Sequence, residues 1–445
     1  MAQKKIGFWE AFSIGVGGMV GGGIFAVLGL TIDLARGAAP IAFLVAGFIA
    51  LLTAYSYVKL SLRYPSEGGS IEFIVQAFGN GLFASIINNL LLISYVIMLA
   101  LYAYAFGSYG SALIAGHDVE WIHKALAAGV IILFMLINLL GAFMTGKAED
   151  IMVAIKLTIL IVFAAVGSMS IDFSHMAPSE WKPLPSVITG GLIIFLAYEG
   201  FELIANTARD VKNPEKTLPR AYYASVIFVI LLYVWIAVVT VGNLTFAEAK
   251  TAQDYVLAKA AEPFFGHIGF IIIGIAALLS TASAINATLY GSGRTSYLIA
   301  KFGELPETFE EQIKNGYEGM IIIALLGIIF ATTFDLNNIS VAGSIGFLIV
   351  FTLVNYANLK LYRETKANRF IAGLGALLGA VATIVLIGYN LMHAPKSLIT
   401  SGIVLLSVVI FSSIYYRFNK KGLSDFMDKK LEREEHAKTA GQSNK

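Results

Sequence analysis

Three ionisable side chains lie within long apolar stretches of this 445-residue sequence. Lys156 lies in EDIMVAIKLTILIVF, and Glu199 and Glu202 flank Gly200 in TGGLIIFLAYEGFELIANTARD. Carboxyl and amino groups can take up and release protons, and in an apolar environment each of them needs a partner or loses its charge. These three residues are therefore candidates for carrying a proton or for binding a charged group.

A glycine-rich run is the second unusual feature. Residues 15–25 read GVGGMVGGGIF, which places six glycines in eleven positions. Each glycine costs roughly 1 kcal/mol relative to alanine in a helix interior, so Gly21, Gly22 and Gly23 predict a break in the helix. The N–H groups that open the second half-helix would then suit a carboxylate. Close helix packing through small residues is the structural alternative.

The elements that must position these residues are membrane helices. The chain is 57% hydrophobic and 13% charged, with a mean hydropathy of +0.76, which is too little charge for the surface of a soluble protein of this size. We expect an all-α polytopic membrane protein with twelve transmembrane helices. The expected spans are residues 10–34, 39–62, 82–115, 121–143, 149–171, 186–208, 219–243, 265–293, 318–335, 340–360, 370–392 and 397–417.

The basic residues predict the orientation of these spans. If the N-terminus is cytoplasmic, six of the 31 Lys and Arg residues lie on the outer side: Arg36, Lys124, Lys182, Lys250, Lys259 and Lys396. Positive charge gathers on the cytoplasmic side of membrane proteins. We therefore expect residues 1–9 and the tail 418–445 in the cytoplasm, with spans 1–6 over residues 10–208 and spans 7–12 over residues 219–417.

The glycine run and the two glutamates fall in the first and the sixth expected spans. Interrupted helices at corresponding positions of two halves are the signature of an inverted repeat with its binding site at the interruptions. In lipid, an interrupted helix is tolerated only where it faces protein or a water-filled cavity. We expect a 5+5 inverted repeat over residues 10–360, with helices 1 and 6 interrupted around a ligand.

Three segments resemble one family of transporters. GVGGMVGGGIF resembles the first-helix signature of the amino acid–polyamine–organocation (APC) superfamily. FLAYEGFELIANTARDVKNPEKTLPRA, residues 195–221, is similar to the sixth helix and the following loop of that superfamily, and STASAINATLYGSGRTSYLIAKFGELP, residues 280–306, to the eighth. Within the superfamily the sequence most resembles the ApcT-like proton-coupled amino acid transporters. The resemblance covers spans 1–10 and implies the leucine-transporter fold, which exposes a central site alternately to either side.

The resemblance also implies where an amino acid would bind. The carboxylate would be held by first-helix amides, here those of Gly21, Gly22 and Gly23. The amino group would meet carbonyl oxygens at the two breaks, here those of Met19, Val20, Phe195 and Leu196. Tyr198, as an aromatic that could gate the site, and Glu199 complete the expected substrate-binding set.

Lys156 has two interpretations. Counting about 1.5 Å per residue from Lys147 puts it roughly 13 Å inside the bilayer, where it should face the protein interior. It could form a structural ion pair with a buried acid such as Glu199 or Glu202. It could instead carry the coupling proton, meeting carbonyl oxygens near Val20 and hydroxyls such as Ser283. The resemblance favours the proton carrier, because ApcT-like transporters have a fifth-helix lysine at the matching position, in place of the sodium ion of sodium-coupled relatives.

The two glutamates also leave alternatives open. Glu202 is the second candidate for proton coupling, since some proton-sensitive APC antiporters have a glutamate at the matching position. ApcT-like proteins have glycine there, and the structural alternative is a carboxylate satisfied by N–H groups of its own helix. Glu199 could bind a cationic side chain, carry a proton or pair with Lys156.

We therefore expect a secondary active amino acid transporter of the cell membrane, working by proton-coupled symport, with ion-independent exchange of amino acids or amines as the alternative. An enzyme is disfavoured because the spans contain no Ser/His/Asp set and no HExxH motif. A channel would not need two interrupted helices. With no cysteine and no metal-ligand spacing of histidines, no metal or cofactor is expected, and a net charge of +2 does not indicate a nucleic-acid partner. The identity of the amino acid and the oligomeric state stay open.

Overall fold

The structure, a computed structural model, describes residues 6–141, 146–313 and 316–419. Most of the expected cytoplasmic tail, from residue 420 onward, and residues 1–5 of the expected N-terminal segment lie outside the described residues. The elements are α1 (Phe8–Met19), α2 (Gly23–Ala35), α3 (Ala39–Arg63), α4 (Ser70–Phe78), α5 (Leu82–Ala115), α6 (Glu120–Leu139), α7 (Gly146–Gly167), η1 (Ser168–Ser170), η2 (Phe173–Met176), η3 (Pro178–Glu180), α8 (Leu184–Ile194), η4 (Phe195–Asp210), α9 (Pro214–Asn243), α10 (Phe246–Thr251), η5 (Gln253–Tyr255), α11 (Val256–Lys301), η6 (Glu307–Glu310), β1 (Gln312–Ile313), β2 (Gly316–Tyr317), α12 (Glu318–Thr333), α13 (Leu336–Lys360), α14 (Tyr362–Thr365), α15 (Arg369–His393) and α16 (Pro395–Phe418).

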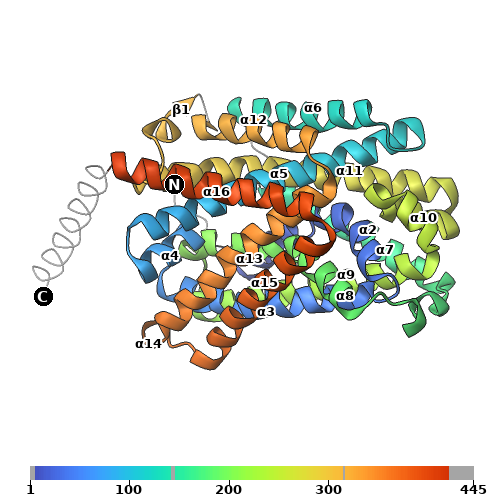
Figure 1. Cartoon of the computed structure of the whole chain (residues 1–445), viewed down its shortest axis with the longest axis horizontal. Helices are drawn as coiled ribbons and strands as arrows, with labels where there is room; N and C mark the ends of the chain where they lie inside the picture. Colours follow the sequence, from blue (N-terminus) through green and yellow to red (C-terminus); the bar gives the residue numbers. More distant parts are fainter. Residues whose placement is uncertain (1–5, 142–145, 314–315, 420–445) are drawn as a thin grey trace, which may run out of the picture.

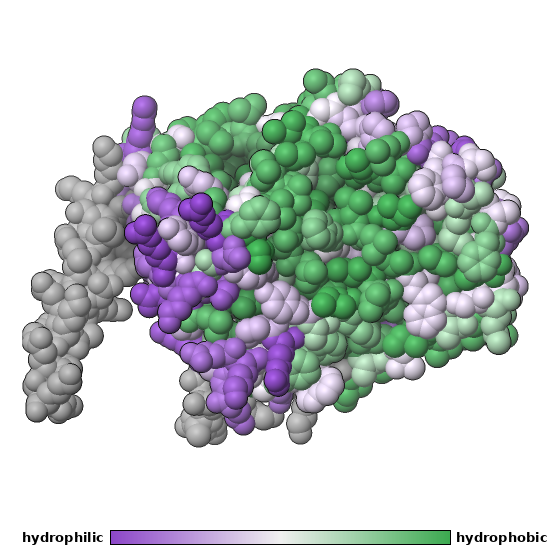
Figure 2. All heavy atoms as spheres, turned by 90° about the horizontal axis from the view of Figure 1, so that it is seen from below, coloured by the Kyte–Doolittle hydropathy of each residue, from purple (hydrophilic) through white to green (hydrophobic). Residues whose placement is uncertain are grey.

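Each of the twelve expected spans falls mainly on helix in the structure, and residues 142–143 of the fourth span lie outside the described residues. Among the described residues, ten helices are long and apolar enough to cross a membrane, and the bent pair α1 and α2 can count as an eleventh span. α12 is a shorter apolar helix of 16 residues. Figure 2 shows the matching surface, with hydrophobic side chains over the middle of the molecule and hydrophilic side chains toward its two ends, most of them at the left. The chain is therefore a multi-pass membrane protein, as predicted, and helices α5, α6, α11 and α12 run side by side in Figure 1.

The predicted interruption of the first span is confirmed. α1 ends at Met19 and α2 begins at Gly23, and the two helices are bent by 46° at this break. α2 is buried along almost its whole length, so the break lies inside the protein and not against lipid. This agrees with the rule that irregular backbone at membrane depth needs protein or water around it.

The sixth span differs from the expectation in its form. α8 passes directly into η4 at Phe195, and in place of a gap the helix changes from α to 3₁₀ geometry over 16 residues. A 3₁₀ helix is wound more tightly than an α-helix, with three residues per turn. η4 packs backbone to backbone against α1, since a Cβ atom placed on Gly200 would overlap the Gly18 carbonyl carbon. The small residue at this crossing allows the two spans of the expected site to approach this closely.

Candidate functional site

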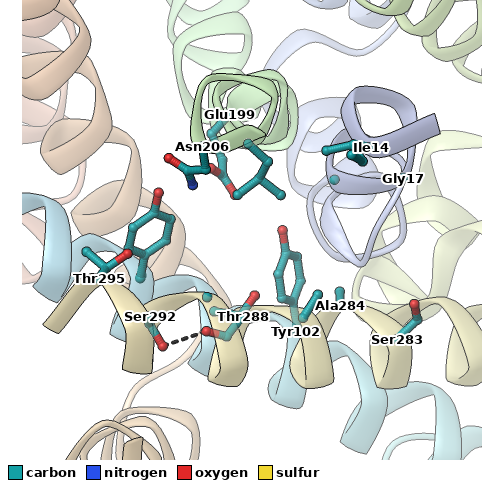
Figure 3. A pocket seen from close by; sticks show the side chains of 15 residues that line it. Ile14, Gly17, Tyr102, Glu199, Asn206, Ser283, Ala284, Thr288, Ser292 and Thr295 are labelled. Carbon is teal, nitrogen blue, oxygen red and sulfur yellow. Dashed lines mark hydrogen bonds between the residues drawn. The ribbon is translucent and has the colours of Figure 1, made fainter. Parts of the chain in front are cut away.

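A cavity of about 70 Å³ lies between α1, α5, η4 and α11, beside the break of the first span. Figure 3 shows side chains from these helices surrounding it, with Tyr102 rising from α5 toward η4. Of the expected site residues, Glu199 lines this cavity. The full lining is Ile14, Gly17, Gly18, Tyr95, Tyr102, Glu199, Leu203, Asn206, Ser283, Ala284, Ala287, Thr288, Gly291, Ser292 and Thr295.

The 3₁₀ geometry of η4 aligns the two glutamates. Residues three apart eclipse one another in a 3₁₀ helix, so Glu199 and Glu202 lie in one row along η4. Tyr95 and Tyr102 are seven residues apart on α5, which brings them onto one helix face two turns apart. Tyr95 bonds to Glu202, and both tyrosines line the cavity with Glu199. Two carboxyl groups of one span thus face two phenol groups of another.

Glu202 is held by hydroxyl groups from three other helices. Its Oε2 accepts hydrogen bonds from Tyr57 Oη of α3 at 3.0 Å and from Ser70 Oγ of α4 at 2.8 Å. Its Oε1 accepts a hydrogen bond from Tyr95 Oη of α5. The donors are therefore hydroxyls of neighbouring helices and not the N–H groups of its own helix that the structural alternative invoked. Since hydroxyls both donate and accept, this cluster can hold the carboxyl group charged or protonated.

Glu199 has a different environment from Glu202. It is 6% exposed, and within the described part of the chain its Oε2 has no hydrogen-bond partner. Leaving a buried polar atom unpaired costs about 1–3 kcal/mol, and more for a charged group. Together with its place in the cavity wall, this makes Glu199 an acceptor that is open to a bound molecule.

Lys156 reaches α1 from α7. Its side chain is 3% exposed, and its Nζ donates a hydrogen bond of 3.1 Å to the carbonyl oxygen of Gly17, which lines the cavity. Gly17 lies three residues before Val20, near which the sequence analysis expected a carbonyl partner for Lys156. α7 packs closely here, since a Cβ atom on Gly17 would lie 2.9 Å from Val153 Cγ2. Ser283 lines the cavity, whereas Ser280 Oγ donates to the carbonyl oxygens of Val20 at 3.3 Å and Gly21 at 2.7 Å.

The three glycines of the break are tightly packed. A Cβ atom would overlap the Tyr102 ring at Gly22, would lie 3.1 Å from Ala284 Cβ at Gly21 and 2.8 Å from Ala197 Cβ at Gly23. None of the three belongs to the cavity lining. The first N–H groups of α2 nevertheless have no partner within their own helix, as at every helix N-terminus. Close packing is therefore present at these positions, beside an end of α2 that could receive an anion.

The expected carbonyl and aromatic groups are buried. Tyr233 Oη donates to the Met19 carbonyl oxygen at 2.6 Å, which occupies one of the carbonyls assigned to a substrate amino group. Tyr198 Oη donates to the Phe43 carbonyl oxygen at 3.2 Å, so its hydroxyl is directed to α3, outside the cavity lining. Phe195 and Leu196 are both 0% exposed.

Several cavity residues were not expected from the sequence. Asn206 of η4 and the hydroxyl residues of α11 contribute much of the polar lining. Thr288, Ser292 and Thr295 are spaced i, i+4 and i+7, which places them on one helix face, and this pattern could have indicated a polar stripe. Among the described residues, no group of three or more His, Asp or Glu side chains could hold a metal ion.

Comparison with known proteins gives the family. Residues 6–414 match the family model described as amino acid permease. An uncharacterised protein of Methanocaldococcus jannaschii is 34% identical over 96% of this chain and 99% of its own length. The inner membrane transport protein YbaT of Escherichia coli is 33% identical over 87% of this chain and 90% of its own length. Cationic amino acid transporter 9, chloroplastic, of Arabidopsis thaliana is 29% identical over 69% of this chain and 57% of its own length. These findings point to a transporter and not to an enzyme, and the chain belongs to the amino acid permease family of the APC superfamily.

Proposed function

We propose that this protein takes up amino acids across the cell membrane by proton-coupled symport, with both of its termini in the cytoplasm. The family supports amino acid transport, and the coupling ion is our proposal. The observation that carries it is the buried amino group of Lys156, which reaches from α7 to the carbonyl oxygen of Gly17 on α1.

The proposed coupling acts through this contact. A protonated amino group offers three donors and a positive charge, and it binds a carbonyl oxygen more strongly than the neutral amine does. Loss of the proton would weaken the contact between α7 and the first half of the broken span. Because a ligand shifts a conformational equilibrium only through different affinities for the two states, Lys156 must meet Gly17 in one state and other partners in the other.

The amino acid itself is proposed to bind at the break between α1 and α2. Its carboxylate would meet the N–H groups of Gly21, Gly22 and Gly23, at the positive end of the α2 dipole. Its amino group would meet backbone carbonyls of Met19, Val20, Phe195 and Leu196. For this, Tyr233 and Ser280 would release the carbonyls of Met19 and Val20 that they now bond.

Glu202 is the rival proton carrier. Its three hydroxyl partners belong to α3, α4 and α5, so a change in its charge would act on these helices and not directly on α1.

Proteoliposomes with an imposed pH gradient, with and without sodium, test the coupling. Accumulation of a labelled amino acid that follows the pH gradient and ignores sodium would support proton symport. Strict sodium dependence would contradict it, and rapid exchange without accumulation would favour the antiporter.

A further inference from the structure

Glu199 is the one carboxyl group among the fifteen residues that line the cavity, and the lining includes neither Lys nor Arg. The remaining polar groups of the lining are the phenols of Tyr95 and Tyr102, the amide of Asn206 and four Ser or Thr hydroxyls. Such a lining offers negative charge and neutral donors and acceptors. It provides no positively charged group for a second carboxylate of a substrate.

The cavity and the proposed carboxylate site lie on different parts of the first span. The cavity borders Ile14, Gly17 and Gly18 of α1, whereas the proposed amides begin at Gly21. An amino acid whose carboxylate binds at the start of α2 would therefore place another part of itself in the cavity. That part would be its side chain, and it would face Glu199.

The unpaired Oε2 of Glu199 determines which kind of substrate side chain can bind in the cavity. This oxygen is buried, and among the described residues no group donates a hydrogen bond to it. A carboxylate without donors in a low-dielectric site is costly, and a cation that binds beside it removes that cost. By contrast, an apolar side chain would leave the oxygen unpaired, and an acidic side chain would add like charge.

We propose that Glu199 selects amino acids whose side chain ends in an amine, and that acidic amino acids are excluded. The proposal rests on the proposed function, because it assumes that an amino acid binds at the break. In the cavity, the side-chain ammonium group lies against Glu199 Oε2, with the hydroxyls of Tyr102 and Thr288 near it as neutral acceptors.

Competition with a labelled substrate in proteoliposomes tests this with two matched pairs of amino acids. Ornithine and norvaline, and lysine and norleucine, differ within each pair only by the terminal amine. Wild-type protein should bind the amine of each pair at least about tenfold more tightly, which is the selectivity expected from a charged hydrogen bond, and should reject glutamate. In Glu199→Gln the tenfold preference should fall to near unity while the affinity for norvaline stays within about threefold.

A matched control is Glu304→Gln, which makes the same change at another buried glutamate that is not part of the cavity lining. It should keep the wild-type preference. Equal affinities within each pair for wild-type protein, or an undiminished preference in Glu199→Gln, would overturn the selectivity role and leave amino acid uptake intact. Failure of wild-type protein to accumulate any labelled amino acid under a pH gradient would instead count against the proposed function.

Discussion

The Lys156 amino group on α7 donates a hydrogen bond to the carbonyl oxygen of Gly17, in the last two turns of α1. The contact lies on the same half of the broken span as the cavity lining, and η4 crosses α1 one residue later at Gly18. One titratable group therefore touches the helix that must move if the cavity is to open past α1. This relationship connects the proposed proton site to the proposed substrate site through a single backbone segment.

If Lys156 carries the proton, both Lys156→Ala and Lys156→Arg should abolish accumulation driven by a pH gradient. Arginine keeps the positive charge but does not release its proton in proteins. The arginine variant therefore keeps any electrostatic role of residue 156 and loses the ability of this residue to carry a proton. Substrate-for-substrate exchange should persist in at least one of the two variants, which shows that the protein is folded. Normal pH-driven accumulation in Lys156→Arg would assign Lys156 a structural role and shift the coupling to Glu202.

The helical framework could be predicted from the sequence because it depends on local composition. Apolar runs set the spans, and the third expected span, residues 82–115, has the bounds of α5. The break at the glycine run also follows from local helix propensity. The eighth span was predicted to start at residue 265, and α11 has a non-helical kink next to this position, at Gly266, where φ is +65° and ψ is −163°. Glycine tolerates this backbone conformation, so a separate helical segment that begins at Val256 leads directly into the span.

The arrangement around the glutamates could not be predicted in this way. An α-helical period separates Glu199 and Glu202 by 60° around the axis, whereas the 3₁₀ geometry of η4 aligns them. Two of the partners of Glu202 come from distant segments: Tyr57 lies on α3 and Ser70 starts α4, a short helix that the sequence analysis did not predict. Such contacts depend on how helices that are distant in the sequence pack together. A single sequence contains no local periodicity that would reveal this packing.

A substitution at Gly22 distinguishes the two interpretations of the glycine run, carboxylate binding and close helix packing. Its φ of −78° and ψ of −15° suit any residue, so only its neighbours restrict it, and a Cβ atom there would overlap the Tyr102 ring. Gly22→Ala should reduce substrate affinity by at least about tenfold. If the amides of the break bind the carboxylate, the double variant Gly22→Ala/Tyr102→Ala should be thermally more stable than Gly22→Ala but should bind substrate more weakly than Tyr102→Ala alone, because the methyl group still covers the amides. A double variant that is restored in stability and binds substrate as tightly as Tyr102→Ala would mean that the glycine serves packing alone.

Gly200 tests the close crossing of η4 and α1. A Cβ atom there would overlap backbone atoms of Gly18 and Met19, which cannot rotate away as a side chain can. Gly200→Ala should therefore lower the free energy of unfolding by at least about 2 kcal/mol, the scale of overpacking in a well-packed core. Gly388→Ala in α15 is the matched control, because a Cβ atom at Gly388 meets nothing within 4 Å. The control should be neutral or stabilising by up to about 1 kcal/mol. The two variants are compared by their melting temperatures in detergent. Equal melting temperatures for Gly200→Ala and Gly388→Ala would contradict the close packing of η4 against α1.

Glu304 should make the stability of the protein depend on pH near neutrality. It lies in the segment after α11, outside the membrane spans, and is 1% exposed. Its Oε2 accepts a hydrogen bond of 2.7 Å from Asn88 Nδ2, and within the described residues its Oε1 has no partner. Burial raises the pKa of this carboxyl from 4.5 to about 7, although the bond from Asn88 opposes the change. The folded protein thus retains a proton over a range in which the unfolded chain has released it.

The sign of the effect follows from the raised pKa. Between pH 4.5 and about 7 the folded state binds more protons than the unfolded state, so stability falls as the pH rises through this range and levels off above it. Over this whole pH range, a pKa shift of this size changes the free energy of unfolding by about 3 kcal/mol. Glu304→Gln removes the titration, so its melting temperature in detergent should fall less than that of wild-type protein between pH 5.5 and pH 8. Glu307→Gln, which changes an exposed glutamate three residues away, should retain the wild-type slope. Identical slopes for wild-type protein and Glu304→Gln would show that the carboxyl group of Glu304 is already ionised throughout this range.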